Sequence, residues 1–131
     1  MFLDASAMVA ILVQEDDAAA LTRRLEQAVE AYTSPIAIYE AVLGIARACN
    51  IAIPAAGTIL DRFLEQTAIR ITPITAEIGR DAISAFERFG KGRHRAALNM
   101  GDCFAYACAR SLDLPLLFKG DDFPQTDIAA G

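Results

Sequence analysis

The sequence contains few of the residues that build zinc sites or disulfide frameworks, and its apolar runs are too short to span a membrane. It has one histidine, three cysteines and no tryptophan among 131 residues. The cysteines, at positions 49, 103 and 108, form no C-x-x-C pair, which argues against zinc and favours a reducing compartment. The uncharged run from Ala5 to Gln14 is too short to cross a membrane, and no positive region precedes it as in a signal peptide. We therefore expect a cytoplasmic protein that does not bind a membrane.

Positive charge is also scarce. The 12 lysines and arginines are outnumbered by 17 acidic residues, and the formal net charge of -5 argues against nucleic-acid binding driven by net charge. Yet a third of the positive charge lies between residues 88 and 95, beside the only histidine, and Asp102 follows seven residues later. This segment is either a solvated loop whose cations stabilise the preceding helix end, or a local anion site beside a carboxylate. Its basic residues are Arg88, Lys91, Arg93 and Arg95.

The order of apolar segments predicts one α/β domain over residues 1–131. Short strands are expected at 1–4, 68–72 and 115–118. Helices are expected at 5–14, from 15 onward, at 35–49, from 54 onward, at 75–89 and at 101–112. Ser34-Pro35 and Thr75 are typical helix starts, and Gly90 a typical helix end. Helices that alternate with strands favour a parallel sheet, where ligands gather at the carboxyl ends of the strands.

Periodic apolar residues predict the buried faces of these helices. In the second helix the expected core positions are Leu21, Leu25, Ala28, Val29 and Tyr32. In the fourth they are Ile59, Leu60, Phe63 and Leu64, and in the fifth Ile78, Ala82, Ala85, Phe86 and Phe89.

Acidic residues occur at four places that the expected fold can bring together. Asp4 follows the first strand, and Asp121 and Asp122 follow the last one. Asp102 opens the last helix, whereas Glu40 lies on an apolar helix face, where an unpaired carboxylate is costly. We therefore treat these positions as candidate functional residues.

Each position also has an ordinary structural explanation. Asp4 suits the N-cap of a helix. Asp102 suits the helix dipole near an N-terminus, with either Asn99 or Asp102 itself as the cap. Glu40 can pair with Arg47, and residues 121–122 suit a polar turn. If the carboxylates instead converge, two of them about 4 Å apart repel by roughly 4 kcal/mol at an effective dielectric constant of 20. Such a cluster requires shifted pKa values or a divalent cation. Oxygen ligands without histidine or cysteine favour Mg²⁺ or Mn²⁺.

Four segments resemble the PIN-domain ribonucleases of the VapC toxin type, from bacterial toxin–antitoxin systems. They are LDASAMVAIL, SPIAIYEAVLGI, GKGRHRAALNMGDCFAYACA and PLLFKGDDFPQTDI, which are spread over the whole chain. The resemblance implies a three-layer α/β/α sandwich with a short parallel sheet. It also implies an endoribonuclease that depends on Mg²⁺, which Mn²⁺ can replace. Its implied protein partners are a small VapB-like antitoxin and a second copy of the chain.

The resemblance further implies roles for single residues. Ser6 is the small hydroxyl residue that accompanies the first aspartate, and Asp121 is a weaker candidate than its neighbour for the fourth acid. The implied catalytic set is Asp4, Glu40, Asp102 and Asp122. The first three of these acids are also the implied metal ligands.

The basic segment has a role in this hypothesis, because carboxylates alone repel RNA. We expect Lys91, Arg93, His94 and Arg95 to bind phosphates that flank the cleaved bond. Two other classes stay open: a receiver-type signalling domain with a Mg²⁺ site, and a non-catalytic binding module. A receiver needs an aspartate at the end of a middle strand, and the segment 68–72 has none.

Overall fold

Four very short strands and six helices make up the fold in the computed structural model, which describes residues 1–131. The strands are β1 (Phe2–Leu3), β2 (Tyr32–Thr33), β3 (Arg70–Ile71) and β4 (Leu116–Leu117). The helices are α1 (Ala5–Val13), α2 (Ala18–Glu26), α3 (Pro35–Cys49), α4 (Ile53–Gln66), α5 (Ala76–Phe89) and α6 (Met100–Ser111). A short 3-10 helix, η1 (Phe123–Gln125), follows β4.

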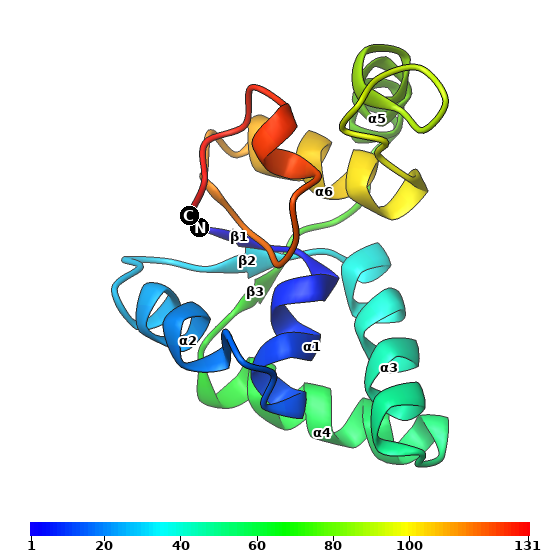
Figure 1. Ribbon diagram of the computed structural model, residues 1–131. Coiled ribbons are helices and arrows are strands. Elements are labelled where there is room, and N and C mark those ends of the chain that lie inside the picture. Colours follow the sequence, from blue (N-terminus) through cyan, green and yellow to red (C-terminus); the bar gives the residue numbers. More distant parts are fainter.

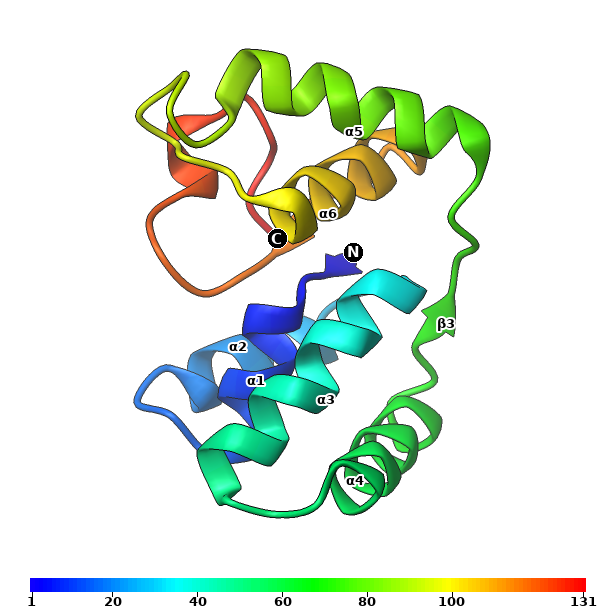
Figure 2. The same ribbon diagram turned by 90° about the vertical axis from the view of Figure 1, so that its right-hand side faces the viewer.

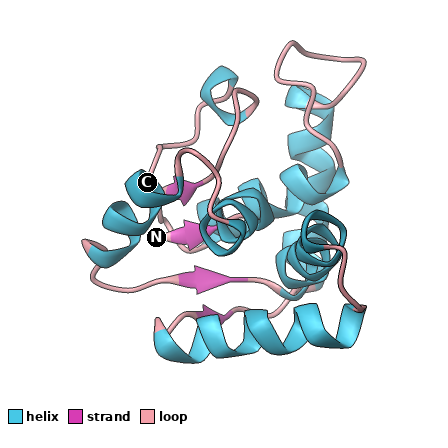
Figure 3. Cartoon of the chain, turned by 60° about the horizontal axis from the view of Figure 1, so that its bottom comes forward, coloured by secondary structure: helices cyan, strands magenta, loops and turns pink.

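The strands form one sheet in the order β3–β2–β1–β4, and every neighbouring pair is parallel. Figure 3 shows the strand arrows pointing in one direction. Parallel neighbours need a long crossover, and the helices provide it between successive strands. The expected α/β class with a short parallel sheet is therefore confirmed.

The two faces of the sheet pack against different helices. Phe2 and Leu116 belong to the core formed with α5 and α6, whereas Leu3 and Leu117 belong to the core formed with α1 to α4. This division follows from the alternation of side chains along a strand, and none of the four residues is exposed. The sheet thus lies between two helical layers (Figures 1 and 2), which confirms the α/β/α sandwich.

Both predicted N-caps are confirmed. The Ser34 hydroxyl accepts a hydrogen bond from the Ala37 N–H at the start of α3, and the Thr75 hydroxyl accepts one from the Ile78 N–H at the start of α5, each at 3.2 Å. No single helix is long and apolar enough to cross a membrane, and only α3 and α4 taken together meet that criterion, across a bend of 118°.

The predictions around α2 were partly wrong. The helix starts at Ala18 rather than at residue 15, and it ends at Glu26. Val29 is therefore outside the helix and fully exposed. Tyr32 belongs to β2, a strand that the sequence did not indicate, because two residues are too few to show an alternating pattern.

Two further positions differ from the expectation. Ile59 and Phe86 fit an apolar helical period, yet they are 39% and 41% exposed, since they lie at the edges of their buried stripes. The predicted helix end at Gly90 is confirmed, because α5 ends at Phe89 with Gly90 as its C-cap, although Gly90 is extended, with φ −67°, and not left-handed. Its small size matters instead, because a Cβ atom there would lie 2.4 Å from the Phe86 carbonyl oxygen.

Candidate active site

Asp4 lies where the chain leaves the carboxyl end of β1 and enters α1. Its backbone N–H donates to the Leu117 carbonyl at 3.0 Å, beyond the last residue of β1. Its Oδ2 atom accepts hydrogen bonds from the Ser6 N–H at 3.0 Å and from the Ser6 hydroxyl at 2.5 Å. The predicted N-cap is confirmed, and it fixes the direction of a carboxylate that is only 4% exposed.

Glu40 reaches the same region from α3. Its carboxylate lies against the backbone of Gly101, where an added Cβ atom would be 2.1 Å from Oε1 and 2.3 Å from Oε2. The proposed partner Arg47 is not used, since none of the ion pairs in the structure involves Glu40. Glu40 is therefore a half-buried carboxylate without a cation beside it.

Asp102 is held in the first turn of α6 by a capping box. Its side-chain Oδ2 accepts from the Asn99 N–H at 3.0 Å, and its own N–H donates to the Asn99 side-chain oxygen at 2.9 Å. Such reciprocal bonds satisfy two of the free donors at a helix start. Of the two caps expected here, Asn99 is the N-cap, and Asp102 is the third residue of the helix, one position after Gly101.

Burial and mutual repulsion perturb these carboxylates. Burial raises the pKa of Glu40 to about 7, and the negative charges of Asp4 and Asp102 add to the increase. Burial also raises the pKa of Asp102 to about 6, with further repulsion from Asp4 and Asp122. The pKa of Asp4 is raised by burial as well, although its cap hydrogen bonds oppose the change. The structure thus brings Asp4, Glu40 and Asp102 into one electrostatically coupled group.

The fourth acid lies at the margin of this group. Asp122 begins η1 in an exposed loop, and its charge contributes to the raised pKa of Asp102. Asp121 is equally exposed but contributes to neither of the raised pKa values of Asp102 and Glu40. Of the two candidates, Asp122 is therefore the one that acts on the carboxylate group.

The carboxylates interact electrostatically but do not form a compact cluster. No three histidine, cysteine, aspartate or glutamate side chains converge closely enough to form a ready-made metal site. The donors present are carboxylate oxygens, which suit a hard divalent cation. A cation would also relieve the repulsion that raises the pKa values. The arrangement can therefore either retain protons or attract a cation.

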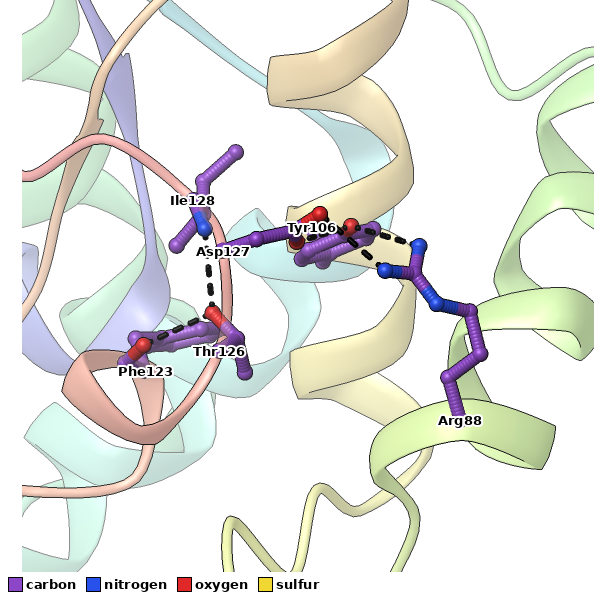
Figure 4. Close-up of polar contacts among 6 residues, drawn as sticks. All are labelled: Arg88, Tyr106, Phe123, Thr126, Asp127 and Ile128. Carbon is purple, nitrogen blue, oxygen red and sulfur yellow. Dashed lines mark hydrogen bonds and ion pairs between the residues drawn. The ribbon is translucent and has the colours of Figure 1, made fainter.

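Arg88 is a structural residue rather than a free cation. Its guanidinium donates to the Asp127 carboxylate at 3.0 Å and to the Tyr106 hydroxyl at 3.3 Å, while that hydroxyl donates to Asp127 at 2.6 Å. Figure 4 shows this network between α5, α6 and the C-terminal segment. The structural explanation of the basic segment therefore holds for its first arginine.

The remaining basic residues occupy the turn after α5. Lys91, Arg93 and Arg95 are exposed and form no ion pair. His94 is partly buried: its Nδ1 accepts from the Ala96 N–H at 3.1 Å, and its ring packs edge-on against another aromatic ring. Figure 2 shows this turn and the loop after β4 on the same side of the molecule. Three cations are thus available to a ligand there.

Comparison with known proteins identifies the family. The PIN domain matches residues 1–129. The chain is 40% identical to VapC ribonuclease Mb0640 of Mycobacterium bovis, over 98% of this chain and 96% of that protein. The chain belongs to the VapC family of PIN-domain proteins. This VapC-family chain is also 38% identical to ribonuclease VapC of Mycolicibacterium smegmatis, over 99% of this chain and 98% of that protein.

A solved structure shares the fold. The crystal structure of Mycobacterium tuberculosis VapC20, described as a toxin that cleaves the sarcin–ricin loop, matches with a TM-score of 0.80. The match covers 99% of this PIN-domain chain and 97% of that chain, at 17% identity, which shows a common fold alone. Membership in the VapC family removes the receiver-type alternative. The segment in which a receiver aspartate was sought is β3, an edge strand.

Sequence analysis missed two long-range polar contacts of the VapC-family chain, of which the first is made by a residue bonded to Ser6. Lys119 contacts Glu15, which is 104 residues away, and Asp127 contacts Arg88, which is 39 residues away. No cap pattern, helical period or short motif marks such long-range pairs. Their only signal is position, since both residues lie in the segment that follows β4.

Proposed function

We propose that the protein is a Mg²⁺-dependent endoribonuclease and the toxin component of a type II toxin–antitoxin system. Its VapC-family relatives are named ribonucleases, which supports the reaction class. The observation that carries the proposal is the coupled group of Asp4, Glu40 and Asp102, which no lysine or arginine balances. Carboxylates without a balancing cation suit metal-assisted hydrolysis of a phosphodiester.

In this proposal Asp4, Asp102 and Glu40 hold Mg²⁺, with Mn²⁺ as a substitute, and Asp122 completes the pocket. When bound, the ion supplies an activated water and balances charge on the phosphate. The fit rests on the oxygen donors and on their raised pKa values rather than on a preformed coordination shell.

The chain's own residues prepare this site. Ser6 orients the Asp4 carboxylate through two hydrogen bonds, and the capping box orients Asp102. Gly101 leaves the space that Glu40 occupies. In the metal-free protein the pKa of Glu40 is raised to about 7, so at neutral pH its carboxyl has to release a proton when it binds the cation.

Substrate positioning falls to the turn after α5. Lys91, Arg93 and Arg95 bind phosphates on either side of the cleaved bond, with His94 between them in the sequence. Their exposure and lack of ion pairs support this role, because a cation already paired with a carboxylate contributes less to RNA binding. The one internal contact among them is a hydrogen bond from Arg93 Nε to the Glu87 carbonyl at 3.4 Å.

Two protein partners complete the proposal: a VapB-like antitoxin and a second copy of the chain. We propose that the second copy binds an apolar groove between α5 and α6, whose lining includes Ile83, Met100 and Phe104. Ile83 and Met100 are 71% and 66% exposed beside it, and exposed apolar patches of this kind mark interaction surfaces. Light scattering should detect a dimer for the wild type and a monomer for Ile83→Glu; equal masses would remove this assignment.

The proposed activity is tested with two conservative variants. Asp4→Asn and Asp102→Asn keep side-chain oxygens that can still cap α1 and α6 but lose the negative charge, so folding should persist while Mg²⁺-dependent RNA cleavage is abolished. Asp61→Asn, an exposed aspartate on α4, is the matched control and should cleave like the wild type. Circular dichroism monitors the fold. Undiminished cleavage by both site variants would refute the proposal.

A further inference from the structure

The loop that carries Asp121 and Asp122 has few anchors. It leaves β4 after Leu117, passes Gly120 at a positive φ of 111°, and returns to the core at Phe123, which is 3% exposed. Residues 119–122 between these points are all exposed. Something other than burial must therefore hold the fourth acid beside Asp102.

Lys119 provides that connection with its backbone and its side chain. The backbone N–H donates to the Ser6 hydroxyl at 3.0 Å, and the same hydroxyl donates to Asp4 Oδ2 at 2.5 Å. The Nζ atom donates to Glu15 and lies 3.6 Å from Asp17 Oδ1. One residue thus joins the loop after β4, the Asp4 corner and the turn between α1 and α2.

The Asp17 carboxylate depends on this contact. Its Oδ1 atom is buried and has no hydrogen-bond partner, so the Lys119 ammonium is the only ion-pair partner it has. Removing the ammonium leaves this oxygen without a partner, at a modest cost because the Asp17 side chain as a whole is 40% exposed. It also leaves Glu15 and Asp17 repelling each other. The turn is therefore expected to move away from the loop when the positive charge is lost.

We propose that Lys119 is a positioning residue, because its contacts connect the loop after β4 to the α1–α2 turn. This connection keeps Ser6, Asp4 and Asp122 in place for metal binding. The inference rests on the proposed metal-dependent activity. Groups that orient metal ligands without touching the metal typically change metal affinity or activity by about 10- to 100-fold when removed.

The test uses Lys119→Met, which keeps the length of the side chain and removes its charge. Arg70→Met is the matched control. It removes an exposed cation on β3 that forms an ion pair with Glu30 at 3.7 Å. Calorimetric Mn²⁺ titration should show about 10- to 100-fold weaker binding for Lys119→Met and no change for Arg70→Met. The Mg²⁺ concentration for half-maximal RNA cleavage should rise by a similar factor, while KM for RNA at saturating Mg²⁺ stays constant.

Two further variants separate positioning from general stability. Lys119→Arg should restore most of the Mn²⁺ affinity, because it keeps the positive charge. Glu15→Gln combined with Lys119→Met should weaken binding no more than Lys119→Met alone, since both changes break one contact. Wild-type Mn²⁺ affinity in Lys119→Met, or a lower Tm with unchanged affinity, would overturn the inference. Mn²⁺ binding by a wild type that cleaves no RNA would instead refute the proposed function, and the affinity comparison would still decide the role of Lys119.

Discussion

Gly101→Ala is expected to impair RNA cleavage strongly without destabilising the protein. Gly101 lies in the first turn of α6, and the Glu40 carboxylate occupies the space where a side chain would start. An alanine Cβ would be 2.1 Å from Glu40 Oε1, whereas ordinary contact begins at 3.4 Å. The carboxylate must therefore move by about 1.3 Å, away from the Gly101 backbone.

The two consequences of this movement differ in size. Stability should be unchanged or higher by about 0.4–1 kcal/mol, because alanine restricts the unfolded chain more than glycine does. The displaced atoms belong to the flexible end of a side chain, so the backbone need not shift. A catalytic group misplaced by about 1 Å, in contrast, can reduce the rate by about 100-fold. The variant should therefore separate folding from activity.

Thermal unfolding and Mg²⁺-dependent cleavage of RNA measure the two effects. Gly57→Ala is the matched control, because Gly57 is a helical glycine with nothing within 4 Å of an added Cβ atom. It should show the small gain in stability and full cleavage. Cleavage by Gly101→Ala at the rate of this control would refute the placement of Glu40 in the active site.

Three other results are expected. In urea unfolding, Glu40→Gln should stabilise the metal-free protein by about 1–2 kcal/mol at pH 8 and by little at pH 4.5. The reason is that the pKa of Glu40 is raised from 4.5 to about 7, so ionisation of its carboxyl opposes folding between these values. Equal effects at both pH values would contradict this. Arg93→Ala combined with Arg95→Ala should lower the salt slope of RNA binding by about 1.4 in fluorescence anisotropy, and an unchanged slope would count against phosphate contacts. Asp127→Asn should cost about 1 kcal/mol of stability, since the Tyr106 hydroxyl loses a charged acceptor; an unchanged Tm would show that the network of Figure 4 is not stabilising.

The buried part of the site could be predicted from the sequence because each acid has a local marker. Asp4 ends an apolar strand, Asp102 follows an Asn cap and a glycine, and Glu40 interrupts an apolar helix face. Such markers depend on neighbours in the chain. They were sufficient to select three acids whose charges act on one another in the folded chain, while the catalytic role of these acids stays a prediction.

The parts that escaped prediction depend on distant residues or on very short elements. β2 has two residues, and pairing with Phe2 and Arg70 rather than its own pattern makes it a strand. The contacts of Lys119 join segments more than 100 residues apart, so only the folded chain reveals them. In the sequence, Arg88 cannot be distinguished from the other basic residues of its segment. Its ion pair with Asp127 is visible only in the folded chain.

The carboxylates of the site both support the fold and oppose it. Asp4 caps α1 and Asp102 completes the capping box of α6, and these hydrogen bonds favour folding. Burial raises the pKa values of both groups, and repulsion adds to the increase for Asp102, so their ionised forms oppose folding as the pH rises. The caps explain why the acids remain in place despite the repulsion. A bound cation would remove the repulsion and leave the caps intact, so its stabilising effect should be largest above pH 7, where Glu40 is also ionised.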